Sequence, residues 1–250
     1  MKYVALEGQL GTPFANAEAI VERLAQYLEN IAALHSPFRR WKPSDTRRHR
    51  SAVPATLTWP PDQIELRTWV NESAIFESRS GRKQHVGYDI HVRTWESDPI
   101  RADFWLRVDF TEGAWWFFNR VGVTFFVDRE DIWVALHRNG QNPFAFVQRG
   151  LLDLGTIWDC DWAGVYGGDY RWPGERPANN SPPRYKSGWM VYLDQARAAR
   201  IGNVEDIRVD KLANGGALFT TATDTIFDHE NAHHMAAAIR LQAALGPLNV

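Results

Sequence analysis

Two neighbouring stretches in the middle of the chain alternate apolar and polar residues, and this pattern restricts the fold more than any other feature. Apolar side chains occupy every second position: Val86, Tyr88, Ile90 and Val92 in the first stretch, and Ala102, Phe104, Leu106, Val108 and Phe110 in the second. A period of two is typical of strands with one buried and one solvent-facing side. The short connection Thr111-Glu112-Gly113 then leads to a third predicted strand within residues 115–127. We therefore expect a three-stranded antiparallel meander.

Helical periodicity and turn residues place the other elements around this meander. Four helices are predicted, at residues 17–34, 62–72, 128–154 with a break near 139–143, and 228–245. Further strands are predicted at residues 2–10, 189–193, 204–209 and 217–222, with long loops at 37–61 and 167–188. The fold class is therefore expected to be α+β, with a central meander in an antiparallel sheet packed by N-terminal, middle and C-terminal helices. Residues 1–250 are expected to form a single domain, or two lobes that meet near residues 128–155.

Composition restricts the compartment and the partners. Cys160 is the single cysteine, and charged residues appear early in the N-terminal sequence, before a signal-peptide apolar region could develop. No apolar run approaches the roughly 20 residues that span a bilayer. The net charge of −2 exerts no overall attraction on nucleic acid or anionic membranes. We expect a cytoplasmic protein without a membrane partner. The 12 Trp and 13 Phe suit a protein that binds another macromolecule.

The sharpest chemical motif is His229-Glu230-Asn231-Ala232-His233, which matches the H-E-x-x-H pattern of zinc hydrolases. On a helix, His229 and His233 would share a zinc ion while Glu230 activates water. After His234, however, no Asp, Glu, His or Cys follows to complete the site, and Arg240 falls on the same helical stripe. The alternative is an ordinary helix start, with Asp228 as N-cap and Glu230 facing the positive end of the helix dipole. An upstream ligand such as His85 or His91 would be needed for zinc, so we expect no metal.

A basic segment offers a second alternative, nucleic-acid binding. Its residues are Arg39, Arg40, Trp41, Lys42, Arg47, Arg48 and Arg50. Arginines could grip phosphates and Trp41 could stack on a base. A solvated loop explains the same residues, and the overall charge is slightly negative. No direct contact with nucleic acid is expected.

The segment Trp158-Asp159-Cys160-Asp161-Trp162 carries the candidate binding residues. An Asp-x-Asp pair can hold a divalent metal, yet in loops such pairs more often cap a turn or bond their own backbone. The flanking tryptophans favour a third interpretation, in which Trp158, Asp159, Asp161 and Trp162 are anchors on a partner-binding surface. Cys160 between two carboxylates is a poor nucleophile. We therefore predict a binding protein and not an enzyme, with no catalytic residues and no cofactor.

The order of these motifs resembles the immunity protein 52 family of polymorphic-toxin immunity proteins. The resemblance rests on Leu151-Leu152 leading into Trp158–Trp162, a Pro-rich loop, Ser187–Leu193, and a short C-terminal helix ending Leu245-Gly246-Pro247-Leu248. This chain has Cys160 where the family usually has Pro between the two Asp. The resemblance implies an α+β protein that binds and neutralises a nuclease toxin, similar to restriction-endonuclease-like toxins delivered between bacteria by type VI secretion. It implies no catalytic residues.

Overall fold

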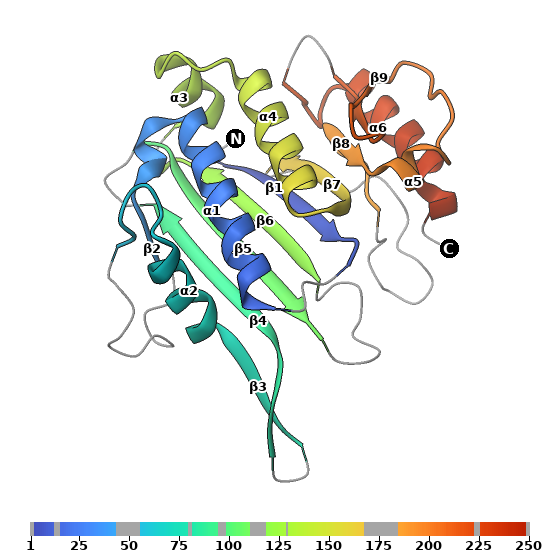
Figure 1. The fold of residues 1–250 in the computed structure, drawn as a ribbon. Helices are drawn as coiled ribbons and strands as arrows, with labels where there is room; N and C mark the ends of the chain where they lie inside the picture. Colours follow the sequence, from blue (N-terminus) through green and yellow to red (C-terminus); the bar gives the residue numbers. More distant parts are fainter. Residues whose placement is uncertain are drawn as a thin grey trace.

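A computed structural model describes residues 3–12, 16–43, 56–79, 82–94, 99–110, 119–128, 130–167, 185–222 and 226–248 (Figure 1). Within these described ranges, ten strands form one sheet in the order β2-β4-β5-β6-β1-β7-β8-β10-β9, with β3 pairing with β4 beside this path. Every strand pair is antiparallel. The strands are β1 (Tyr3–Leu10), β2 (Trp41–Pro43), β3 (Ala74–Arg79), β4 (Arg82–Thr94), β5 (Arg101–Asp109), β6 (Arg120–Phe126), β7 (Cys160–Gly167), β8 (Met190–Leu193), β9 (Arg208–Lys211) and β10 (Ala217–Thr220).

The predicted meander is confirmed as β4, β5 and β6. Ile90 lies opposite Leu106, which in turn lies opposite Val121, so one apolar face continues across the three strands. The N-terminal strand β1 then pairs with both β6 and β7 and so joins the meander to the C-terminal strands. The connection at residues 111–118 lies outside the described residues.

Helices cover one face of this sheet, as Figure 1 shows for α1, α2 and α4. Their side chains form one buried cluster with the apolar face of the strands, for example Leu24 of α1, Trp69 of α2 and Leu154 of α4 with Leu6 of β1. The helices are α1 (Ala17–Leu34), α2 (Gln63–Glu72), α3 (Ile132–Arg138), α4 (Pro143–Ile157), α5 (Gln195–Ala198) and α6 (Ala232–Leu245). Short 3-10 turns lie at Ser36–Arg39 and Gly246–Leu248. The α+β class is confirmed.

The C-terminal helix packs on the opposite face at one end of the sheet. Val191 and Leu193 of β8 form a second cluster with Leu241 and Leu245 of α6. Met190 and Tyr192, which alternate with them, belong to the first cluster. Because neighbouring strand residues point to opposite sides, α6 and α4 must lie on different faces.

Local sequence signals account for several helix boundaries. The Asn16 side chain caps α1, where it accepts a hydrogen bond of 2.9 Å from the Ala19 backbone, and α1 spans the residues that periodicity predicts. The predicted long helix breaks at Asn139-Gly140 into α3 and α4, and Gly140 has a φ of +73°, which favours glycine. No helix in the described residues is long and apolar enough to cross a membrane.

Candidate partner-binding surface

The four residues predicted to bind a partner, Trp158, Asp159, Asp161 and Trp162, lie where α4 turns into β7. Three of them are buried, and Trp158 is the first. Trp158 caps the end of α4 and has no exposed surface. Its indole stacks on Phe104 with ring centroids 5.7 Å apart and meets the edge of Tyr27 at 6.3 Å. Trp158 is therefore a core residue that joins α4 and α1 to β5, and it is not accessible to a partner.

Asp161 and Trp162 continue into β7, a central strand that was not predicted from the sequence. Trp162 is 3% exposed, and its indole N–H donates to the Lys186 carbonyl at 3.1 Å. The Asp161 side chain is fully buried and lies 2.7 Å from the Arg197 guanidinium. Tyr185 donates to the same carboxylate at 3.3 Å. Neither residue belongs to an accessible surface, so these predicted positions are corrected.

Asp159 alone of the four is exposed. It occupies the turn with a φ of 46°, and its carboxylate pairs with Arg23 of α1 at 2.5 Å. Asp159 borders an open depression of about 690 Å³ that Tyr192, Asp194 and Asn214 also line. Both carboxylates of this depression are paired with an arginine: Asp159 with Arg23, and Asp194 with Arg197 at 2.7 Å. These ion pairs offset the negative charge of the depression.

The structure also separates the two aspartates of the Asp-x-Asp pair. Asp159 turns toward α1, whereas Asp161 is enclosed with Arg197 and Tyr185. No sequence signal reports this burial, because Arg197 is 36 positions downstream of Asp161. The strand pattern of β7 was obscured by Asp161, the one charged residue of this strand.

The H-E-x-x-H motif does not lie on one helix. Asn231, not Asp228, caps α6, and the helix begins at Ala232, so His229 and Glu230 precede it. The Asp228 carboxylate instead accepts from the Glu230 backbone at 2.9 Å. The predicted start of this helix was therefore wrong by one turn, because the short Asn side chain reaches the His233 and His234 N–H groups.

Metal binding at that motif finds no geometric support in the described part of the chain. No group of three or more His, Cys, Asp or Glu side chains is arranged there to hold a metal ion. The suggested rescuing ligands His85 and His91 lie in β4, far along the sheet order from β8 and β10, on which α6 packs. Arg240 pairs with Asp206 at 2.8 Å.

The basic segment is only partly described, because residues 44–55 lie outside the described ranges. Trp41, the residue expected to stack on a base, is fully buried in β2, where it lies opposite Thr94 of β4. Its ring is part of the core beside Phe38. Trp41 therefore cannot serve as a stacking platform.

A different surface gathers the features of a protein interface: the sheet face that points away from α1 and α4. We call it the open face and define it by these side chains of β1, β4, β5 and β6: Tyr3, Glu7, Asp89, His91, Arg93, Arg101, Asp103, Trp105, Arg107, Arg120, Thr124 and Phe126. All of them are exposed or partly exposed, whereas the residues that alternate with them are at most 5% exposed. None of the described helices packs on this face over β4, β5 and β6.

Cross-strand register arranges the open face in rows. One row runs from His91 through Trp105 and Gly122 to Glu7. A Cβ on Gly122 would lie 2.7 Å from the Trp105 indole. Glycine at this position therefore lets the indole lie close over the sheet. The next row places Asp89, Arg107 and Arg120 side by side.

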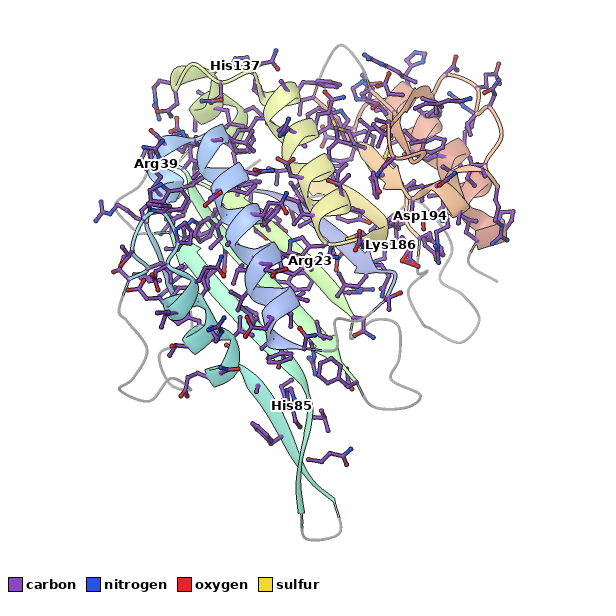
Figure 2. All side chains as sticks on the ribbon, in the orientation of Figure 1. Arg23, Arg39, His85, His137, Lys186 and Asp194 are labelled. Carbon is purple, nitrogen blue, oxygen red and sulfur yellow. The ribbon has the colours of Figure 1, made fainter. Side chains whose placement is uncertain are left out.

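Charged groups surround the aromatic residues of the open face. Arg120 and Glu7 pair at 2.7 Å with about a fifth of each side chain exposed. Beside the open face, Lys186, labelled in Figure 2, lies 5.9 Å from the ring centroid of Tyr166 in β7, which is paired with Ala5 of β1. Burial lowers the pKa of its ammonium, with Glu7 opposing and Arg120 reinforcing this effect. At the other edge, the Arg101 guanidinium lies 4.6 Å over the Phe126 ring.

This arrangement suits recognition of another protein. Trp, Tyr and Arg are the residue types that most often carry the binding energy of protein interfaces. Ring platforms held by neighbouring strands are ordered before binding, so little side-chain entropy is lost when a partner arrives. Trp105 and Arg107 alternate with the apolar residues of the second predicted strand and so fall on its solvent-facing side. Nothing in the sequence indicates that none of the described helices covers that side.

The fold and this surface together define the class of protein: an α+β protein with an open antiparallel sheet, one face of which is partly free of helices among the described residues. Among solved structures, the chain is similar to the Pseudomonas aeruginosa T6SS protein PA0821, with a TM-score of 0.52 and 13% sequence identity. The alignment covers 98% of this chain and 76% of that chain, and at this identity the likeness concerns the fold. No protein-family model and no curated protein sequence match the chain. The resemblance to the immunity protein 52 family is not confirmed.

Proposed function

We propose that this chain is an immunity protein that binds and neutralises a cognate nuclease-type toxin in the bacterial cytoplasm, and that the open face contacts the toxin. The observation that carries the proposal is the row that contains Trp105 and Glu7, next to the arginines of β5 and β6. It combines an ordered aromatic ring with charged groups on a face that none of the described helices covers. A binding protein needs such a surface and needs no catalytic group.

Two further lines support the proposal. The fold is like that of a T6SS protein over nearly the whole chain, and the sequence resembles the immunity protein 52 family in the motifs quoted above. Binding through the open face replaces the surface expected at Trp158–Trp162, of which only Asp159 is exposed. The toxin's active site, or its access to substrate, would then be blocked by a one-to-one complex.

Co-expression tests this function directly. The chain is produced together with the product of the adjacent toxin gene, and growth is compared with that of cells that produce the toxin alone. We expect growth to be restored and the two proteins to elute together on gel filtration. Restored growth without any complex would contradict the proposal, because neutralisation would then not depend on binding.

A further inference from the structure

The strand order of the sheet ends at β2 and at β9, which lie at opposite sides of the molecule (Figure 1). At the β2 end, Pro43 has no backbone N–H to donate, and the Leu57 N–H donates to the Trp41 carbonyl at 3.0 Å. Such features keep an edge strand from pairing with another chain. At the other end, β9 pairs with β10 and with no other strand in the described part of the chain. We call its second side the free edge.

The hydrogen bonding at the turn between β9 and β10 shows which backbone groups point to the free edge. The Leu212 N–H donates to the Gly216 carbonyl at 2.9 Å, so these two residues form a hydrogen-bonded pair. Opposite residues of an antiparallel ladder alternate between bonded and non-bonded pairs. By register, the backbone N–H and C=O of Asp210 therefore point to β10. Those of Val209 and Lys211 point away from β10, toward the free edge.

The side chains of β9 are accessible as well as its backbone. All four residues of β9 are exposed or partly exposed, whereas every residue of β8 and β10 is buried. Val209 faces the second cluster, on the side of α6, so Arg208 and Asp210 face the other side. The Arg208 Nε donates to Asp210 at 3.0 Å, with the two side chains 52% and 32% exposed. An ion pair this exposed contributes little to stability, so both groups can accept a further partner.

The charges of β9 are complementary to those of a second β9 strand. If two copies pair antiparallel with Val209 on the twofold axis, Arg208 of each copy lies opposite Asp210 of the other. An axis through Arg208, Asp210 or Lys211 would instead place two like charges opposite each other. Opposite charges across a strand pair stabilise it and like charges destabilise it. Charge therefore favours the register that is centred on Val209.

The backbone favours the same register. Since the N–H and C=O of Val209 point to the free edge, the two Val209 residues on the axis can exchange both of their hydrogen bonds, as in the closely spaced pairs of an antiparallel ladder. We infer that two copies of this chain associate through β9, so that their sheets join into one continuous sheet. The inference goes beyond the proposed function and does not depend on it.

This dimer is expected to be weak and specific. Charged residues on an edge strand discourage pairing with most strands, and here the same residues select a second β9. A pair of four-residue strands buries less than the roughly 1,200 Å² of a stable interface, so association depends on protein concentration. The open face lies on β1, β4, β5 and β6, away from β9 in the strand order, so each copy can still bind one toxin.

Sedimentation velocity of the full-length chain alone, from micromolar to near-millimolar concentration, measures this association. The wild type is expected to shift from the mass of one chain to that of two. Arg208→Glu and Asp210→Arg are each expected to weaken association by about tenfold or more, because each creates two pairs of like charges across the axis. Lys211→Glu is the matched control. It changes the net charge as much as Arg208→Glu does, but Lys211 lies opposite the apolar Ile207 of the second copy, so association is expected to stay unchanged.

Mixing the two weakened variants tests the register itself. Arg208→Glu leaves only acids on that side of β9 and Asp210→Arg leaves only arginines, so a mixed pair again has opposite charges across the axis. Association is expected to return on mixing. Thermal unfolding checks that each variant is folded, and two folded variants that do not associate when mixed overturn the inference.

Hydrogen exchange of the wild type gives a second readout that needs no variant. The Val209 and Lys211 amides are expected to exchange more slowly as protein concentration rises. A chain that stays monomeric over the whole range overturns the inference. So does protection of β9 by the toxin alone, because a strand of the toxin would then occupy the free edge. In both cases the proposed function stands, since co-expression tests it separately.

Discussion

The Arg197 guanidinium lies 2.7 Å from the Asp161 carboxylate, whose side chain is completely buried in the central strand β7. Arg197 also contacts Asp194 at 2.7 Å and donates to the Tyr185 hydroxyl at 3.0 Å. This ion pair connects α5 to the middle of the sheet. Asp161, which the sequence alone suggests is a surface residue, is therefore a buried residue that holds α5 against the sheet.

Replacing Asp161 by Ala is expected to lower the free energy of unfolding by about 3–5 kcal/mol, because it removes the buried partner of the partly buried Arg197 guanidinium and leaves only the more exposed Asp194 to pair with it. Asp159→Ala provides the matched control. Its carboxylate is 65% exposed, so the loss should stay below about 1 kcal/mol. Urea unfolding monitored by tryptophan fluorescence measures both values. Equal effects of the two substitutions would show that Asp161 is not buried as described.

Stability is expected to fall as the pH is lowered below about 6.5, in part because of His35. This side chain is 6% exposed, and burial lowers its pKa from the ordinary value of 6.5. Below that value the unfolded chain takes up a proton that the folded chain does not, so the folded state loses stability. The measurement is the urea midpoint between pH 7.5 and 5.5, compared with that of His35→Phe, which keeps a ring beside Phe38. A variant with the same pH dependence as the wild type would contradict the assignment to His35.

Cys160 is expected to resist thiol reagents while the protein is folded. The thiol is 1% exposed, and burial raises its pKa well above 9.0, with the charges of Asp161 and Asp159 acting in the same direction. The reactive thiolate is therefore scarce and enclosed. Labelling with a chromogenic disulfide at pH 8 should be slow in buffer and rapid in denaturing urea. Rapid labelling of the native protein would show that the α4–β7 corner opens.

Trp105→Ala is expected to weaken toxin binding by about 2 kcal/mol or more, which corresponds to roughly 30-fold. The indole lies over Gly122 on the open face, where it would supply a large ring to the proposed toxin partner. The control is Ile239→Ala, at an exposed position of α6. Titration calorimetry with the toxin measures both, and thermal unfolding checks that each variant is folded. Unchanged affinity for Trp105→Ala would remove the centre of the open face from the proposed interface.

Patterns that are local in the sequence were sufficient for much of the fold. Alternation predicted the meander because neighbouring strand residues must face opposite sides, and Asn16 with regular helical spacing predicted α1. The start of α6 was misplaced because Asp228 and Asn231 are both good caps, and local sequence does not decide between them. Strand β7 was missed because the charged residue Asp161 hid the pattern of a buried strand.

The candidate site was decided by tertiary structure. Sequence shows that Trp105 and Phe104 face opposite ways, but not which of the two faces the helices will cover. It also cannot show that Trp158 would stack on Phe104 in the core, since these residues are brought together by α4 packing on the sheet. The sequence by itself determined which residues share a face. Only the packing of helices distant along the chain decided which face is buried and which one stays exposed among the described residues, because burial depends on contacts between segments far apart in the sequence.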